Sequence, residues 1–333
     1  MDRRVLDALA AHHGLTADGV ERMLELAVAR PSRADLQGFG VRVLHLAGVL
    51  SLAAGVVFFV AANWSALAVF GRFALVEAVL VGAVALALWR PPPQAVGRYA
   101  LLLAFIVTGA LFALYGQTYQ TGADVYELFL NWALLGVVFA VAAQWSVVWA
   151  AWVLVLNVAL WLFCGARPEA GALWVLFSPW SLTTSQLLLV PLLVNVCLWA
   201  VGLLLERTDA ARFAPRWLGR FALAWAVAAG TWAAVIVVVR GASAEGAAGL
   251  AVPLLVFLGV GFVTLRRRAD VFPLAAIEGG LIALGAAWII EAWGLDEIGL
   301  FFVLAAWLIV TSTLSGRYLM RLVRAWGGQE ASA

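Results

Sequence analysis

A series of long apolar runs constrains the fold more than any other feature of this chain. A helix of about 20 apolar residues crosses the hydrocarbon core of a lipid bilayer. Hydrophobic residues make up 65% of the 333 residues and charged residues 12%, far from the balance of a soluble domain. We therefore predict an all-α fold, a polytopic transmembrane helix bundle of about ten spans. The expected spans are residues 43–62, 73–89, 99–115, 125–143, 146–164, 186–205, 221–239, 248–265, 272–290 and 298–314.

The spans divide the chain into five expected parts. Residues 1–42 contain no long apolar run and resemble two short amphipathic helices joined at Gly14, which predicts a soluble cytoplasmic helical segment without a cleavable signal peptide. Whether the short apolar stretch 172–180 lies in the interface or belongs to a span stays open. The other four parts are the first five spans (43–164), an outer or interfacial loop (165–185), the last five spans (186–316) and a cytoplasmic tail (317–333).

The basic residues predict the orientation of the bundle. All 21 of them are arginine. If residues 1–42 are cytoplasmic, only Arg72, Arg167 and Arg240 fall on the outer side, and the other 18 fall in cytoplasmic segments. This asymmetry follows the positive-inside rule. We therefore expect both termini in the cytoplasm.

Polar side chains concentrate at the outer ends of the early spans. The stretch GQTYQTGAD, residues 116–124, contains no Leu, Ile, Val or Phe. Asp124, Glu127 and Asn131 are spaced i, i+3 and i+7, which places them on one helical face. An amide or carboxylate in lipid needs a partner or a water-filled cavity. The candidate ligand-binding cluster comprises Asn63, Glu77, Gln117, Tyr119, Gln120, Asp124, Glu127 and Asn131.

Two interpretations of this cluster compete. In the structural one, Gly122 adopts a positive φ, Asp124 caps the fourth span, Glu127 completes a capping box, and Gln117 and Gln120 satisfy free carbonyls of the third span. In the functional one, the whole set forms an outward-facing polar site. Without a basic partner, such a site favours a cation, protons, or a neutral ligand held by amides and hydroxyls.

Four polar residues lie elsewhere in the spans. Glu278 and Glu291 are secondary intramembrane carboxyls, and Asn157 and Asn195 lie deep in spans five and six. Glu278 precedes glycines at 279, 280 and 285, which predicts a close helix crossing that satisfies the carboxyl; a proton-carrying role is the alternative.

Groups that would carry catalysis or hold a metal are sparse. The chain has three His and two Cys, and it lacks the metalloprotease, nucleophile-elbow and phosphate-loop motifs. Cys164 and Cys197 are expected to be buried thiols and not a disulfide. We expect no catalytic residue, no metal, no cofactor and no nucleic-acid partner.

Two stretches resemble a known family. FFVAANW (58–64) after a short helical segment, followed by YGQTYQTGADVYELFLNWALLG (115–136), is similar to the bacterial predicted-membrane-protein family called domain of unknown function 2157. The resemblance covers about residues 5–160. It implies a multi-pass protein of the bacterial inner (cytoplasmic) membrane and brings no activity or cofactor to these residues.

Three hypotheses of function follow. The favoured one is a non-catalytic envelope scaffold or sensor, whose partners are the lipid bilayer and another envelope membrane or periplasmic protein. The second is a transporter or permease-like protein for a small cation or polar solute, in which Pro191 and Pro253 could break spans six and eight. The third is a membrane-embedded glycan or lipid enzyme that uses Asp124 or Glu77 as a general base.

Overall fold

The computed structural model describes residues 10–26, 33–120, 122, 124–166, 182–206, 208–209, 213–241, 246–267, 270–293 and 297–330. The described secondary structure is helical throughout. The helices are α2 Ala17–Leu26, α3 Arg33–Ala62, α4 Val69–Trp89, α5 Ala95–Tyr119, α6 Val125–Ala143, α7 Ser146–Ala166, α9 Thr184–Leu187, α10 Leu189–Leu205, α11 Arg216–Arg240, α12 Ala248–Arg267, α13 Phe272–Trp293 and α14 Glu297–Glu330.

Ten helical segments in the described part of the chain are long and apolar enough to cross a membrane, with α9 and α10 together forming one of them. The predicted all-α transmembrane bundle of ten spans is therefore confirmed. Residues 172–180 and 1–9 lie outside the described residues. Of the predicted soluble segment, the described part includes α2, where the Thr16 hydroxyl accepts the Gly19 amide at 3.3 Å.

Two helices extend well beyond their predicted spans. α3 begins at Arg33 where the apolar run begins at 43, and α14 continues to Glu330 where the run ends at 314. Residues 33–42 thus continue the first spanning helix instead of forming a separate segment. Hydropathy predicts only the part of a helix that lies in lipid. The helical backbone itself can continue into water where its residues become polar, so the ends of the helix and of the apolar run differ.

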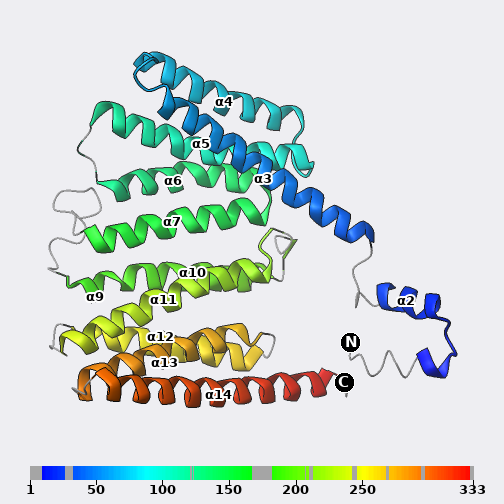
Figure 1. The fold of residues 1–333 in the computed structure, drawn as a ribbon, viewed down its shortest axis with the longest axis vertical. Coiled ribbons are helices and arrows are strands. Elements are labelled where there is room, and N and C mark those ends of the chain that lie inside the picture. The colour runs from blue at the N-terminus through cyan, green and yellow to red at the C-terminus, as the bar shows by residue number, and fades with distance from the viewer. Residues whose placement is uncertain are drawn as a thin grey trace.

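The spanning helices lie side by side and successive ones run in opposite directions (Figure 1). α5 ends and α6 begins at one end of the bundle, which we call the motif end. α10 ends, α11 begins, α12 ends and α13 begins at the opposite end, which we call the arginine end. α7 packs closely on α6 and more sparsely on α10 and α11, so it marks the boundary between the first five spans and the last five.

Glycine and tryptophan set two close helix crossings. A Cβ on Gly109 of α5 would lie 2.5 Å from the ring of Trp132 on α6, and the Trp132 indole N–H donates to the Phe105 carbonyl at 2.8 Å. The Trp307 ring of α14 packs on Gly285 of α13 in the same way, and the Trp307 indole N–H donates a hydrogen bond to a carbonyl of α13 at 3.0 Å. Small residues let neighbouring helices approach closely, which is how membrane helices associate without a hydrophobic driving force.

An asparagine pair joins the two sets of spans. Asn157 of α7 and Asn195 of α10 are both fully buried and exchange two side-chain hydrogen bonds, of 3.0 and 2.7 Å. Each amide also donates to a carbonyl one turn earlier in its own helix, at 2.9 and 2.8 Å. Both deep amides are thus satisfied by structure alone.

The two cysteines differ in their surroundings. Neither is in a disulfide; Cys164 is buried as expected, whereas Cys197 is exposed, so the prediction of a buried thiol was wrong there. Cys197 lies two residues after buried Asn195, on another face of α10. The Cys164 thiol contacts the Leu187 carbonyl at 3.4 Å, an oxygen left without its helical partner because Pro191 has no N–H. Pro191 follows the break between α9 and α10, whereas α12 continues through Pro253.

Candidate functional site

The polar stretch 116–124 reverses the chain between α5 and α6. Gln120 ends α5 in the left-handed conformation, with φ of 43°, and its N–H donates to the Gly116 carbonyl at 3.1 Å. Gly122 has φ of 67°, as the sequence predicted. Gly122 is thus the second left-handed residue within residues 120–122. Glycine suits this position because a Cβ is unfavourable in the left-handed conformation. The turn brings the ends of α5 and α6 together at the motif end.

The predicted capping box does not form. Asp124 occupies the N-cap position of α6, with φ of −64° and ψ of 147°, but its side chain makes no capping hydrogen bond. The Glu127 N–H bonds instead to the Asp124 backbone carbonyl at 3.0 Å, and the Tyr126 hydroxyl donates to the Glu127 carboxylate at 3.3 Å. The side-chain hydrogen-bonding capacity of Asp124 is therefore not spent on the helix end. No hydrogen bond from Gln117 or Gln120 side chains to α5 carbonyls occurs among the described residues.

Five of the eight predicted residues line one pocket of about 510 Å³ between the ends of α5 and α6. We call it the α5–α6 groove. Phe112 and Tyr115 contribute apolar and aromatic surface to it. The polar residues of the groove are Gln117, Gln120, Asp124, Glu127 and Asn131.

Charge in the α5–α6 groove is one-sided. Asp124 and Glu127 are partly buried, and its described lining residues include no arginine or histidine. Arg72, in the first turn of α4, is engaged elsewhere: its Nε donates to the Leu67 carbonyl at 3.0 Å and its guanidinium lies 3.8 Å from the Trp64 ring centre. Carboxylates concentrated in a cleft create a negative potential that attracts cations.

Glu77 lies in an adjoining pocket and not in the α5–α6 groove itself. This second pocket, of about 570 Å³, is lined by α4, α5 and α6 and shares Phe112 and Tyr115 with the α5–α6 groove. Its lining is mostly apolar, and Glu77 is its one carboxylate among the described residues. The two pockets form a continuous surface along α5 with one more acidic group in its apolar part.

Two predicted residues lie outside both pockets. The Asn63 amide donates to the Phe59 carbonyl at 2.9 Å, near the end of α3. The Tyr119 ring lies 4.9 Å from the Tyr115 ring and 6.0 Å from that of Phe73, between centroids. Sequence analysis also missed Thr118, whose hydroxyl is buried without a hydrogen-bond partner in the described part of the chain. Its place within the polar stretch was the available signal.

The secondary carboxyls are separate from this site. Glu278 of α13 accepts a hydrogen bond from the Ser315 hydroxyl of α14, and a Cβ on nearby Gly280 would lie 2.5 Å from the Thr231 hydroxyl. This supports the close-crossing interpretation of Glu278. Glu291 is exposed near the end of α13. Within the described residues, no group of three or more His, Cys, Asp or Glu could hold a metal ion.

Comparison with known proteins identifies a family for the first part of the chain. Residues 7–149 match the model of a family described as predicted membrane protein, domain of unknown function 2157 (DUF2157). The matched region includes α3 to α6 and therefore the whole α5–α6 groove. Neither the curated proteins nor the solved structures contain a match to the chain.

Proposed function

We propose that this multi-pass membrane protein has a non-catalytic role as an envelope scaffold or sensor. Its residues 7–149 match the DUF2157 family of predicted membrane proteins. In this role the α5–α6 groove faces the outer side and binds a polar segment of another envelope membrane or periplasmic protein. The membrane concerned is the bacterial inner membrane, with both termini in the cytoplasm.

The observation that carries the proposal is the convergence of five polar side chains on one pocket. Gln117, Gln120, Asp124, Glu127 and Asn131 come from two helices and share a volume of about 510 Å³. A turn with a helix cap needs one left-handed residue and one capping side chain, and the Asp124 side chain does not cap. A binding role accounts for the convergence of these groups and for the Asp124 carboxylate, which the helix end does not use.

The chemistry of the groove favours a basic, hydrogen-bonding occupant. Asp124 and Glu127 supply negative charge, and three amides supply both donors and acceptors. Arginine or lysine of a partner segment could pair with the two carboxylates, and the aromatic ring of Tyr115 offers a surface for the side-chain stem. The described lining residues include no His, Ser or Cys that could act as a nucleophile or base beside Asp124, so the enzyme hypothesis receives no support from this site.

Site-specific photo-crosslinking in intact membranes tests the proposal. A photoreactive amino acid replaces Gln117, which is exposed and lines the α5–α6 groove, and in a matched control it replaces Tyr119, which is exposed on the same helix and lines neither pocket. We expect a discrete protein adduct from position 117 and none from position 119. Adducts with lipid alone, or the same adduct from both positions, would overturn the proposal.

A transporter is the second candidate, and one observation favours it. The pocket that holds Glu77 of α4 adjoins the α5–α6 groove, so one further carboxylate lies beside the groove. Ion-coupled transporters place carboxylates along the path of the ion. Uptake of a labelled monovalent cation into proteoliposomes, lost in Glu77→Gln, would favour transport. Equal leakage in wild type, Glu77→Gln and empty liposomes would remove this candidate.

A further inference from the structure

The pocket that holds Glu77 is a cleft between two helices, and we call it the α4–α6 cleft. α4 and α6 both pack on α5, and among the described helices these two are not closely packed on each other. α5 forms the floor of the cleft with residues such as Thr108 and Phe112, while α4 and α6 form its walls. Leu135 and Val138 on the α6 wall are 55% and 63% exposed, so the cleft is open toward the surrounding lipid.

The α4–α6 cleft extends deeper into the membrane than the α5–α6 groove. Along α6, which begins at the motif end, the lining residues of the groove fall within 124–131 and those of the cleft within 135–139. α5 runs in the opposite direction and gives the same order, with residues within 112–120 in the groove and within 108–115 in the cleft. At 1.5 Å per helical residue, the cleft extends about 12 Å further along α6 than the groove.

The groove and the cleft lie on one face of α6. Asp124, Glu127 and Asn131 of the groove are followed by Leu135 and Val138 of the cleft, each three or four residues after the last, which is the spacing of a single helical face. Two aromatic residues of α5 line both pockets. One elongated partner can therefore contact the polar groove and the apolar cleft together.

Glu77 is an unpaired carboxylate in this cleft. It lies eight residues after Val69, the first residue of the 21-residue α4, which is about 12 Å along a membrane-spanning helix, and it is exposed. It forms no hydrogen bond or ion pair within the ranges that the structure describes. Thr108 of the same cleft donates its hydroxyl to the Ala104 carbonyl of its own helix at 2.8 Å. A carboxyl group that faces lipid is costly unless it has a partner or water.

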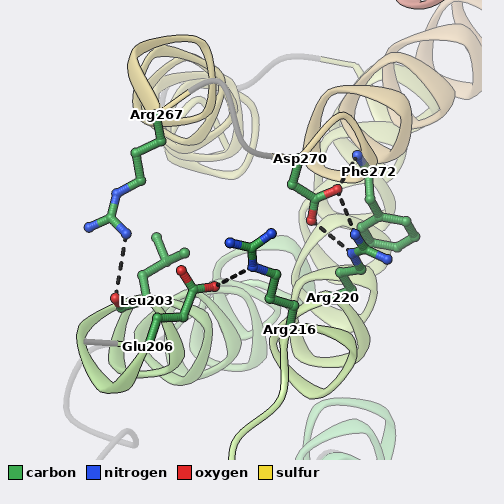
Figure 2. Close-up of polar contacts among 7 residues, drawn as sticks. All are labelled: Leu203, Glu206, Arg216, Arg220, Arg267, Asp270 and Phe272. Carbon is green, nitrogen blue, oxygen red and sulfur yellow. Dashed lines mark hydrogen bonds and ion pairs between the residues drawn. The ribbon is translucent and has the colours of Figure 1, made fainter. Parts of the chain in front are cut away.

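Carboxylates at the arginine end are satisfied by the chain itself. Asp270 accepts two hydrogen bonds from Arg220, of 2.8 and 3.0 Å, and the Glu206 carboxylate lies 3.5 Å from Arg216 (Figure 2). By contrast, the described residues that line the α4–α6 cleft and the α5–α6 groove include no arginine, lysine or histidine. Glu77 and the two groove carboxylates are thus left for a basic partner to neutralise.

A transmembrane helix fits this combination better than a lipid does. An acyl chain fills apolar space, but it brings no group that pairs with a carboxylate at the depth of Glu77. A helix satisfies its own backbone hydrogen bonds in lipid and can present a basic side chain to an acidic one inside the membrane. The outer end of the same helix would lie beside the α5–α6 groove.

We propose that the partner of the α5–α6 groove is a membrane-spanning protein, one helix of which packs in the α4–α6 cleft. This helix carries a lysine or arginine opposite Glu77, and residues at its outer end bring further positive charge to Asp124 and Glu127. The inference rests on the proposed function, because the same partner occupies the groove, and it specifies that partner as a transmembrane protein.

Crosslinking from a second depth tests the inference. A photoreactive amino acid replaces Val138 in the α4–α6 cleft, and in a matched control it replaces Ile309 of α14, outside both pockets. The two positions are 63% and 66% exposed, and they lie 13 residues after Val125 and 12 residues after Glu297, the first residues of their helices. We expect position 138 to give the same protein adduct as position 117, and position 309 not to give it. The crosslinked partner peptide should belong to an apolar run of about 20 residues.

The combination of adducts separates this inference from the proposed function. A protein adduct from position 117 with lipid adducts alone from position 138 would overturn the transmembrane helix and leave the role of the groove standing. A protein adduct from position 138 alone would support a helix in the cleft and overturn the role of the groove. No protein adduct from either position, or the same adduct from position 309, would overturn both.

The change Glu77→Leu tests the ion pair. It replaces an exposed carboxylate that has no described partner, so the melting temperature of the isolated protein should not fall. We expect the adduct from position 138 to fall about threefold or more, as for the loss of one polar contact between membrane helices. Glu291→Leu, the same change at an exposed carboxylate outside both pockets, should leave the yield unchanged. An undiminished yield in Glu77→Leu would overturn the pairing of Glu77 with a basic residue of the partner.

Discussion

Asn157 and Asn195 pair their side-chain amides across α7 and α10, with hydrogen bonds of 3.0 and 2.7 Å in a fully buried position. The pair is a direct polar link between the first five spans and the last five. An amide left alone there would have neither water nor a second protein partner. The pair therefore provides a test of how the two sets of spans are held together.

The first asparagine removed from the pair should lower the stability of the protein more than the subsequent removal of the other. Asn157→Ala and Asn195→Ala should each destabilise the protein by about 1–3 kcal/mol, since each leaves a buried amide without its cross-helix partner. The double variant should cost less than the sum by about 0.6–1.7 kcal/mol, the range of hydrogen bonds between membrane helices. Thermal unfolding in detergent of the four proteins measures this coupling, and strictly additive effects would contradict it.

The Gly109–Trp132 contact should be intolerant of a methyl group. Gly109→Ala places a Cβ 2.5 Å from the Trp132 ring, so the ring must move and lose its bond to the Phe105 carbonyl. We expect a loss of about 1–3 kcal/mol in stability, as for other overpacked cores. Gly82→Ala on α4, where no atom lies within 4 Å, is the control and should be neutral or slightly stabilising. Equal melting temperatures for the two variants would contradict the account.

The orientation of the bundle is a prediction from its arginines. A topology reporter fused after Gly122 or Asp296 should be extracytoplasmic, and one fused after Arg212 or Arg268 should be cytoplasmic. Gly122 lies at the motif end, whereas the other three fusion sites fall outside the described residues. The opposite location at any two of the four sites would reverse the assignment.

Features that depend on one stretch of sequence, such as a spanning helix or the face of a helix, could be predicted, whereas features that depend on packing between helices could not. Ten spans were predictable because a bilayer requires a long apolar helix for each crossing. The spacing of Asp124, Glu127 and Asn131 placed them on one helical face, and they do line one pocket. Asn63 and Glu77 were grouped with them from depth alone, and Tyr119 because it lies in the polar stretch. The positions of Asn63 and Glu77 depend on how α3 and α4 pack against α5, which the sequence does not specify.

Side-chain partners were harder to predict than helix positions. Asp124 does occupy the predicted N-cap position, but the backbone turn does not fix the rotamer that would have let its carboxylate cap α6. The arginines at the other end were assigned to topology from their number. The pairing of Arg220 with Asp270, 50 residues apart, depends on α11 and α13 lying side by side.

Charge neutralisation in the α5–α6 groove should leave the fold intact. Because the Asp124 side chain makes no capping hydrogen bond, Asp124→Asn removes charge without removing a cap, and Glu127→Gln keeps the shape of its side chain. We expect each variant, and Gln120→Ala, to change stability by less than about 0.5 kcal/mol, as surface changes usually do, while abolishing the phenotype that the wild-type protein restores to a deletion strain. Wild-type function in all three variants would reduce the polar stretch to a connecting loop.

The most direct test of the binding role measures crosslinking from position 117 in the Asp124→Asn/Glu127→Gln background. The account predicts that the protein adduct falls about tenfold or more, because each charged hydrogen bond to a partner contributes about 1.5–3 kcal/mol, while the amount of protein in the membrane and its melting temperature stay as in wild type. An undiminished yield of the same adduct would show that the two carboxylates of the α5–α6 groove do not hold the partner.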